Sequence, residues 1–342
     1  MTAASFAEGH AAHADPGHPE RPARLDAIRQ RVAADPALAA LVPVDAPSAS
    51  RAALERVHAP DYLDLLETFC DTGGGRLDPD TYATRASYAV ARRACGGLVA
   101  VADVVLSGDC NNGFAVGRPP GHHARPMQAM GFCLLSHVAV AARHAQAVHG
   151  AERVLIVDVD VHHGNGTQEA FYDDPSVLFV STHQAGLFPG GGRLDETGVG
   201  AGQGATVNVP LPAGTDDALV SLYRAVLPPL AARFRPDVVF VSAGFDAHRL
   251  DPLGGLACSV AGLVDAIGVC AEVADRWAGG RLVLSLEGGY HADALAACVT
   301  GTLRRLLDST APVEDPFGPS RIAGPDLGPL TERVRQRHGV GV

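Results

Sequence analysis

The feature that most constrains the fold is a set of short apolar runs that do not alternate with polar residues. A strand with one solvated face alternates, whereas a strand covered on both faces is apolar throughout. Ala-rich helical patterns separate the runs, so we expect one α/β domain whose mainly parallel sheet has helices on both faces. The expected strands span 114–116, 154–159, 177–181, 207–209, 238–242 and 282–286, and the expected helices span 88–106, 137–148, 217–234, 261–277 and 292–307.

The domain organisation is expected to be simple, because the chain shows no internal repeat and no composition break before about residue 310. Residues 1–310 are expected to form one domain that carries the chemistry. Residues 311–342 are expected to form an extension packed on the same domain. That extension is rich in Pro and Gly and ends in a short polar helix near 330–337.

Composition disfavours several classes of protein, although a local basic patch stays open. The net charge of -11 disfavours nucleic acid and anionic membranes as partners. The seven cysteines are scattered without a CxxC pair, which argues against a disulfide framework or a thiolate zinc site and suits a reducing compartment. The sequence shows neither a signal peptide nor an apolar stretch of about 20 residues. We therefore expect a cytoplasmic protein, and a homo-oligomer stays open.

Several expected strands end in polar clusters. The runs LIVDVDVHH, VVFVSAGFDAH and LVLSLEGGYH share this pattern, and the segment RPPGHHA adds two adjacent histidines. Ligands of a parallel sheet bind beyond the carboxyl ends of its strands, so these side chains should meet at one edge. They are His122, His123, Asp158, Asp160, His162, His163, Asp246, His248 and Tyr290.

A metal ion would explain why acids end a buried strand. Residues two apart in an extended chain point the same way, so Asp158, Asp160 and His162 should share a face. Carboxylates that repel in a dry site are stabilised by a cation. Carboxylate and imidazole ligands without thiolate suit zinc or another first-row ion, with Asp246 as the natural third ligand. Three protein ligands leave a position for water, whose pKa the metal lowers from 15.7 towards about 7.

A single histidine or a DxD pattern is usually without function, but the four clusters together are specific. The chain resembles the zinc-dependent histone deacetylase family of the arginase/deacetylase superfamily, and it is most similar to bacterial members of the class II type. The resemblance covers about 290 residues, from HPERPARLDAI at 18–28 to the helix after EGGY. RPPGHHA and DVDVHHGNGTQ carry it most specifically.

The resemblance implies one catalytic ion per chain. Zinc, with Fe²⁺ as the alternative, would be bound by Asp160, His162 and Asp246. His122 and His123 would flank the metal-bound water, with His123 acting as general base and later as general acid.

The resemblance also implies residues that orient these groups. Asp158 would orient His122, and Asn165 stands where many relatives carry an aspartate that orients His123. A neutral partner stabilises imidazolium less than a carboxylate does, so His123 should remain a competent base. Tyr290 would donate to the substrate carbonyl and stabilise the oxyanion together with the metal.

Further residues would hold the substrate, the product and a second ion. Phe132, next to Gly131, and Phe188 match the aromatics of a narrow substrate tunnel, and Arg24 matches an arginine linked to acetate release. A structural K⁺ or Na⁺ is implied at Asp158, Asp160, His162, Ser181 and Thr182. The chain departs from the family pattern at Ser136, His137 and His291, and we assign no role to His137, His163 or His291.

The resemblance implies hydrolysis of the N-acyl amide of a primary amine, with acetyl-lysine favoured. Acetylpolyamine hydrolysis is the alternative, although Leu253 occupies the DPxG position near which polyamine-selective relatives place a glutamate. A manganese ureohydrolase would need carboxylates that the motifs lack. A non-catalytic sensor of acylated ligands is the alternative from another class, and the retained Tyr290 argues against it.

Overall fold

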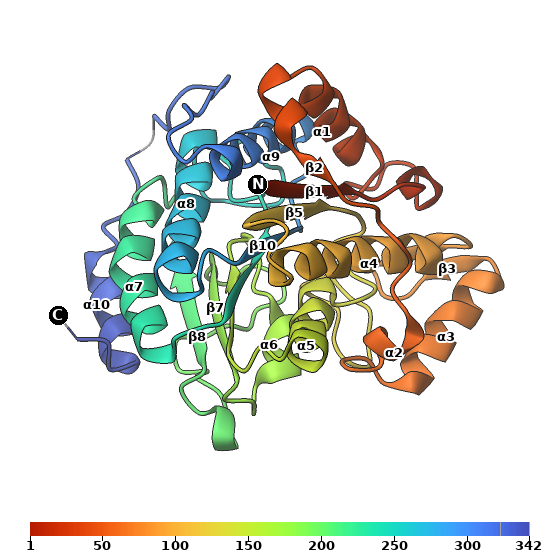
Figure 1. Ribbon diagram of the computed structural model, residues 1–342, viewed down its shortest axis with the longest axis horizontal. Helices are drawn as coiled ribbons and strands as arrows, with labels where there is room; N and C mark the ends of the chain where they lie inside the picture. Colours follow the sequence, from red (N-terminus) through yellow and green to blue (C-terminus); the bar gives the residue numbers. More distant parts are fainter. Residues whose placement is uncertain (322, 342) are drawn as a thin grey trace.

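The computed structural model describes residues 1–321 and 323–341. Its centre is an eight-stranded sheet in the order β2-β1-β5-β10-β9-β6-β7-β8, and every neighbouring pair is parallel (Figure 1). The expected fold class is therefore confirmed. The strands are β1 (Thr2–Phe6), β2 (Val42–Pro43), β5 (Asn112–Val116), β6 (Val154–Asp158), β7 (Val177–Gln184), β8 (Thr206–Leu211), β9 (Val238–Ala243) and β10 (Leu282–Leu286).

Helices cover both faces of the sheet (Figure 1). One face carries α1 (Ala23–Ala33), α7 (Leu219–Phe234), α8 (Val260–Trp277) and α9 (Ala292–Leu307), and the other carries α4 (Ser87–Leu106), α5 (His137–His149) and α6 (Asn165–Phe171). Apolar side chains of the strands alternate between these two cores. Leu155 and Val157 of β6 face the first, and Val154 and Ile156 face the second. This double burial is the physical reason for the apolar runs.

The remaining elements lie at the periphery. A small antiparallel pair joins β3 (Gly74–Arg76) to β4 (Tyr82–Thr84) and contacts α3 (Pro60–Asp71), whereas the short helix α2 (Arg51–Leu54) contacts α5. After α9, the chain runs through an irregular strap to α10 (Gly328–Arg337), which contacts α7 and β8. Short 3₁₀ segments are η1 (His10–Ala12), η2 (Pro36–Ala40) and η3 (Gly200–Gly202).

The first strand is the main element that the sequence pattern did not predict. β1 lies inside the sheet between β2 and β5, with Thr2 opposite Asn112 and Phe6 opposite Val116. Its sequence TAASF has no β-branched apolar residue, so it carries little strand signal. Small side chains suit this place, because α4 crosses β1 closely and Ser5 Oγ lies 3.0 Å from where a Cβ on Gly97 would stand.

No helix within the described part of the chain is both long and apolar enough to cross a membrane.

Candidate metal centre and active site

The three expected ligands of the catalytic metal converge at the carboxyl edge of the sheet. β6 ends at Asp158, one residue earlier than expected, so Asp160 and His162 lie in the segment that follows it, and Asp246 follows the end of β9. His162 Nδ1 lies 3.0 Å from Asp160 Oδ1 and 3.2 Å from Asp246 Oδ2. Both aspartates are fully buried, and His162 is 9% exposed. One nitrogen and two carboxylate oxygens thus point at one small space.

The second oxygen of each carboxylate is held by the backbone. Gly288 N–H donates to Asp160 Oδ2 at 2.8 Å, and Val161 N–H donates to Asp246 Oδ1 at 2.8 Å. A Cβ at Gly288 would lie 2.0 Å from Asp246 Oδ2, so only glycine fits there. The backbone therefore fixes the orientation of both acids and leaves one oxygen of each facing His162.

The electrostatics of this cluster fit a divalent cation. Burial, followed by the charge of Asp160, raises the pKa of Asp246 to about 7. Burial alone would lower the pKa of His162, but its hydrogen bonds to the two acids raise it to about 10. Two buried carboxylates thus require a positive charge between them. Carboxylate oxygen and imidazole nitrogen donors in this number suit zinc in an open catalytic site.

The tandem histidines lie beside the three ligands and have different partners. His122 Nδ1–H donates to Asp158 Oδ2 at 2.9 Å, whereas His123 Nδ1–H donates to the amide oxygen of Asn165 at 2.7 Å. Their ring centroids are 4.0 Å apart, and His122 Nε2 lies 3.8 Å from Asp160 Oδ1.

The different partners separate the two imidazoles in pKa. Burial would lower the pKa of His122, but the charges of Asp158 and Asp160 raise it well above its usual value. Burial, followed by His122 and His162, lowers the pKa of His123 well below its usual value. Of the pair, His123 is therefore the one that stays neutral and able to accept a proton.

Glu287 supports the tandem histidines, and sequence reasoning missed it. Its Oε2 accepts from Gly121 N–H at 2.6 Å and from His122 N–H at 3.1 Å. Burial raises the pKa of this carboxyl to about 7. The motif EGGY predicts a role for its tyrosine, but nothing in the sequence shows that its glutamate binds a loop 165 residues earlier.

Tyr290 is positioned by contacts of its backbone and its ring with neighbouring residues. Asp251 Oδ2 accepts from Tyr290 N–H at 2.6 Å, and Arg24 Cζ lies 4.9 Å from the centre of the Tyr290 ring. The ring of Phe132 meets it edge-on at 5.6 Å. Burial raises the pKa of the phenol well above its usual value, so the hydroxyl remains a donor. Asp251 is a second positioning residue that the sequence did not reveal.

The expected tunnel residues lie around His123 and Tyr290. Phe188 is 37% exposed, and its ring meets that of His123 edge-on at 5.1 Å. Gly131 fits closely between them, because a Cβ there would lie 2.4 Å from His123 Cδ2 and 2.8 Å from Phe188 Cε1. Phe132 has φ 67°, an uncommon conformation for an aromatic residue, and its ring contacts Tyr290 as well as that of His18. Two aromatic rings thus border the site from different loops.

Arg24 belongs to a buried ionic network beneath the site. Its guanidinium donates to the carbonyl oxygens of Gly289, at 2.7 Å, and Glu287. It also contacts Glu20, which forms a second, bidentate pair with Arg118. All these charges are paired, which is the condition for burying them.

The residues expected around a monovalent ion are also brought together. Asp158 lies opposite Ser181 in the pairing of β6 with β7, and Thr182 Oγ1 is 3.5 Å from the Asp158 carbonyl oxygen. Asp160 and His162 follow directly along the chain.

The histidines without an expected role have structural surroundings. His291 is the N-cap of α9 and its ring accepts from Ala294 N–H, while buried His137 begins α5. His163 Nε2–H donates to Gln168 Oε1 at 2.9 Å, and its ring packs on His183. These two rings lie directly against the backbone of Gly191 and Gly192, in the loop that carries Phe188. His248, which the strand-end rule had placed at the rim, is 1% exposed and packs against Phe317.

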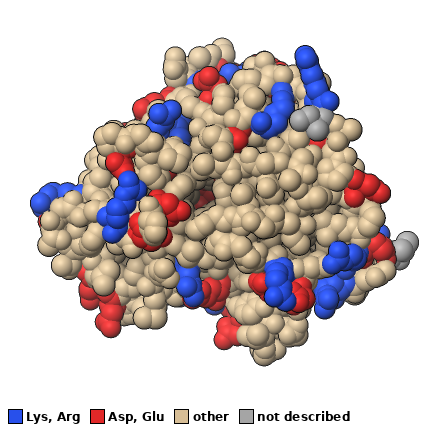
Figure 2. Space-filling view, turned by 180° about the vertical axis from the view of Figure 1, so that it is seen from behind, with Lys and Arg blue, Asp and Glu red and all other residues tan. Residues whose placement is uncertain are grey.

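On the face shown in Figure 2, basic and acidic side chains are interspersed, mostly towards the margin of a broad area of other residues. Nucleic-acid binding rests on clustered basic side chains that neutralise phosphates. This face, as far as its described residues go, offers no continuous basic area of that kind.

Comparison with known proteins agrees with the resemblance. The model of the histone deacetylase domain matches residues 18–306. A histone deacetylase-like amidohydrolase of Pseudomonas aeruginosa is 39% identical over 88% of this chain and 80% of that protein, and a probable deacetylase of Archaeoglobus fulgidus is 38% identical over 86% and 82%. The crystal structure of the HDA15 HD domain superposes with a TM-score of 0.88 at 37% identity, covering 98% of this chain and 95% of that one.

The plant relatives are longer than the region they share with this chain. The chloroplastic histone deacetylase 14 of Arabidopsis thaliana is 45% identical over 66% of this chain, and the match spans 55% of that protein, or about half its length. The matched histone deacetylase domain covers most of the present chain, including every candidate catalytic and metal-binding position discussed above. The chain therefore belongs to the histone deacetylase family.

Proposed function

We propose that this protein is a cytoplasmic, zinc-dependent deacetylase that hydrolyses N-acetyl and related N-acyl amides of primary amines, with acetyl-lysine substrates favoured. The observation that carries the proposal is the convergence of His162 Nδ1 with one oxygen of Asp160 and one of Asp246. This donor set lies beside two imidazoles of opposite pKa shift, which is the arrangement needed for proton transfer at a metal.

The proposed mechanism assigns the proton steps to this chain's own residues. Asp160, His162 and Asp246 would hold the zinc ion, which when bound would supply a Lewis acid for the acyl carbonyl and for a water molecule. His123 is neutral and its Nδ1–H is held by Asn165, so Nε2 is free to take a proton from the attacking water. The same nitrogen then delivers the proton to the leaving amine.

Two further groups act on charge that develops during the reaction. The Tyr290 hydroxyl donates to the carbonyl oxygen as negative charge develops on it. His122, which Asp158 keeps protonated, provides positive charge next to the same space. The backbone bond from Tyr290 to Asp251 sets the position of the phenol.

The tunnel supports a linear substrate. Phe188 lies against His123 and Phe132 lies against Tyr290, and both rings offer flat apolar surfaces that suit an alkyl chain. Arg24 lies beneath Tyr290, where it can contact the released acetate, and a K⁺ or Na⁺ ion is proposed at Asp158 and its neighbours. Leu253, whose N–H donates to Asp251, offers no charge to a second ammonium group, so acetylpolyamines rank second.

The test is a kinetic comparison on one metal-quantified preparation. An acetyl-lysine peptide, acetylputrescine, N8-acetylspermidine and longer acyl-lysines are assayed for kcat/KM. We expect turnover of the peptide that is lost in His123→Ala and strongly reduced in Tyr290→Phe. Zinc binding without turnover of any acyl amide would favour a sensor and refute the proposal. A polyamine preference above about a hundredfold, or some 2.7 kcal/mol, would reverse the order of substrates.

A further inference from the structure

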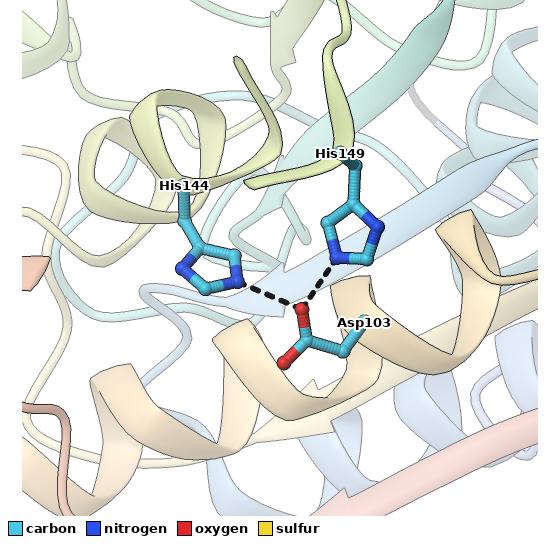
Figure 3. Close-up of side chains that lie close together, drawn as sticks. All are labelled: Asp103, His144 and His149. Atoms are coloured by element: carbon cyan, nitrogen blue, oxygen red, sulfur yellow. Dashed lines mark hydrogen bonds and ion pairs between the residues drawn. The ribbon is translucent and has the colours of Figure 1, made fainter. Parts of the chain in front are cut away.

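A second cluster of metal-ligating side chains lies away from the active site (Figure 3). Asp103 comes from α4, and His144 and His149 come from α5. His144 Nε2 lies 2.7 Å and His149 Nε2 lies 2.6 Å from the same atom, Asp103 Oδ1. One ligand atom from each residue lies within 4.8 Å of the other two.

The cluster is at the opposite edge of the sheet from the proposed zinc site. Asp103 lies near the end of α4, shortly before β5 begins at Asn112, and His149 ends α5, shortly before β6 begins at Val154. The strands are parallel, so their amino ends share one edge and the catalytic groups lie at the other.

The two histidines meet because α5 ends at this point. They are five residues apart, whereas side chains on one helical face are three or four apart. Gly150 takes a left-handed conformation with φ 69°, and Ala151 N–H bonds back to Ala145 O, which closes the helix at His149. The two ring centroids are 5.8 Å apart as a result. The convergence is therefore a product of the fold and not of a local repeat.

The chemistry of the cluster fits a transition-metal ion. Two imidazoles and one carboxylate are the donors that zinc, cobalt, nickel and copper accept, whereas calcium and magnesium prefer oxygen alone. Neutral imidazoles and one carboxylate give a single negative charge, which attracts a dication. The side chains of Asp103, His144 and His149 are 45%, 13% and 21% exposed, so an ion can enter from solvent while the two rings remain held by packing.

We propose that Asp103, His144 and His149 form a second metal site, which binds a first-row divalent ion and joins α4 to α5. These two helices flank the stretch 107–136, which contains β5 and both tandem histidines. An ion held by Asp103 on one helix and by His144 and His149 on the other would cross-link α4 to α5, and it would bind only the folded chain. It therefore raises the thermal stability of the protein by an amount that grows with the logarithm of its free concentration.

Arg56 disfavours coordination of the ion by His144, and this effect gives the proposal a specific test. Its Nη1–H donates to His144 Nδ1 at 3.3 Å, which leaves the proton of the neutral ring on Nε2, facing Asp103. Coordination through Nε2 instead requires the proton on Nδ1, where it would face the guanidinium. Arg56 is exposed and can turn away, but its removal should favour the ion.

The experiment measures zinc binding to the intact protein with its catalytic site already filled by zinc. Equilibrium dialysis at micromolar free zinc, followed by metal analysis, should give two ions per chain in the wild type and one in His149→Ala and Asp103→Asn. Arg56→Ala should bind the second ion roughly tenfold more tightly than the wild type. Tenfold is the lower end of the change in metal affinity that follows when a hydrogen-bond partner of a metal ligand is mutated. His10→Ala is the matched control, because it breaks a single His–Asp pair with Asp26 at 2.9 Å and should keep two ions.

Thermal unfolding with and without added zinc is the second measurement. The melting temperature of the wild type should rise with zinc and that of His149→Ala should not. Deacetylase activity should be the same in all four variants, because the cluster is remote from the catalytic groups. One ion per chain in the wild type, or a second ion that persists in both ligand variants, would overturn the proposal.

Discussion

Replacing Asn165 by Asp would place a negative charge against the proposed general base. The His123 Nδ1–H bond to Asn165 Oδ1 is 2.7 Å long, and an aspartate is nearly the same size as the asparagine it replaces. The change would therefore be one of charge. At present the pKa of His123 is held well below its usual value by burial, followed by His122 and His162.

The direction and size of the effect follow from charge proximity. A carboxylate beside the ring favours imidazolium, so the pKa of His123 must rise. An opposite charge this close typically moves such an equilibrium by about one to three pH units. Because the base must be unprotonated to act, the acidic limb of the kcat/KM profile should move to higher pH by that amount. At a pH below the acidic limbs of both proteins, kcat/KM of the variant should be lower than that of the wild type by about tenfold for each unit by which the pKa of His123 rises.

The assay is kcat/KM for an acetyl-lysine peptide from about pH 5 to 9, with zinc content measured for each variant. Asn165→Ala is the control, because it removes the hydrogen-bond acceptor without adding charge. Its acidic limb should stay in place or move to lower pH. An Asn165→Asp profile whose limb coincides with that of the wild type, at equal zinc content, would refute the assignment of His123 as the base.

Three further changes test the surroundings of the site. Asp251→Asn removes the charge that accepts from Tyr290 N–H and should lower kcat by roughly ten- to a hundredfold with little change in KM, as charge-assisted hydrogen bonds contribute about 1.5–3 kcal/mol. Gly288→Ala places a Cβ 2.0 Å from Asp246 Oδ2 and should reduce the zinc content found by metal analysis. Burial raises the pKa of Glu287 from 4.5 to about 7, so its ionisation destabilises the fold increasingly as pH rises through that window. Urea unfolding should therefore show Glu287→Gln gaining up to about 3 kcal/mol on the wild type between pH 5 and pH 8.

Much of the fold was predictable because burial on both faces leaves a pattern in the sequence. The expected strand 154–159 corresponds to β6 (Val154–Asp158), and the expected helix 292–307 corresponds to α9 (Ala292–Leu307). β1 was not predicted because the Ala and Ser residues of TAASF have low strand propensity. Their small side chains instead allow close packing against α4. The place of β1 beside the edge strand β2 is therefore set by tertiary contacts.

In the candidate site, too, some residues could be predicted from the sequence and others could not. Side chains at strand ends were predictable, since parallel topology brings them to one edge. Glu287 and Asp251 were not, because each binds backbone N–H groups of a distant loop, and backbone groups carry no sequence signature. The pairing of His144 with His149 was equally hidden, because it depends on where α5 ends.

The strand order has a consequence for the synthesis of this protein. β9 and β10 are made last among the strands, yet they fill the middle of the sheet between β5 and β6. Until they emerge from the ribosome, the earlier strands cannot join into one sheet, and the unpaired edges beside β5 and β6 are open to association with other chains. Asp246 and Tyr290 arrive with those last strands. An incomplete chain therefore lacks both the proposed third metal ligand and the phenol, and the final pairing that closes the sheet is also the event that completes the proposed site.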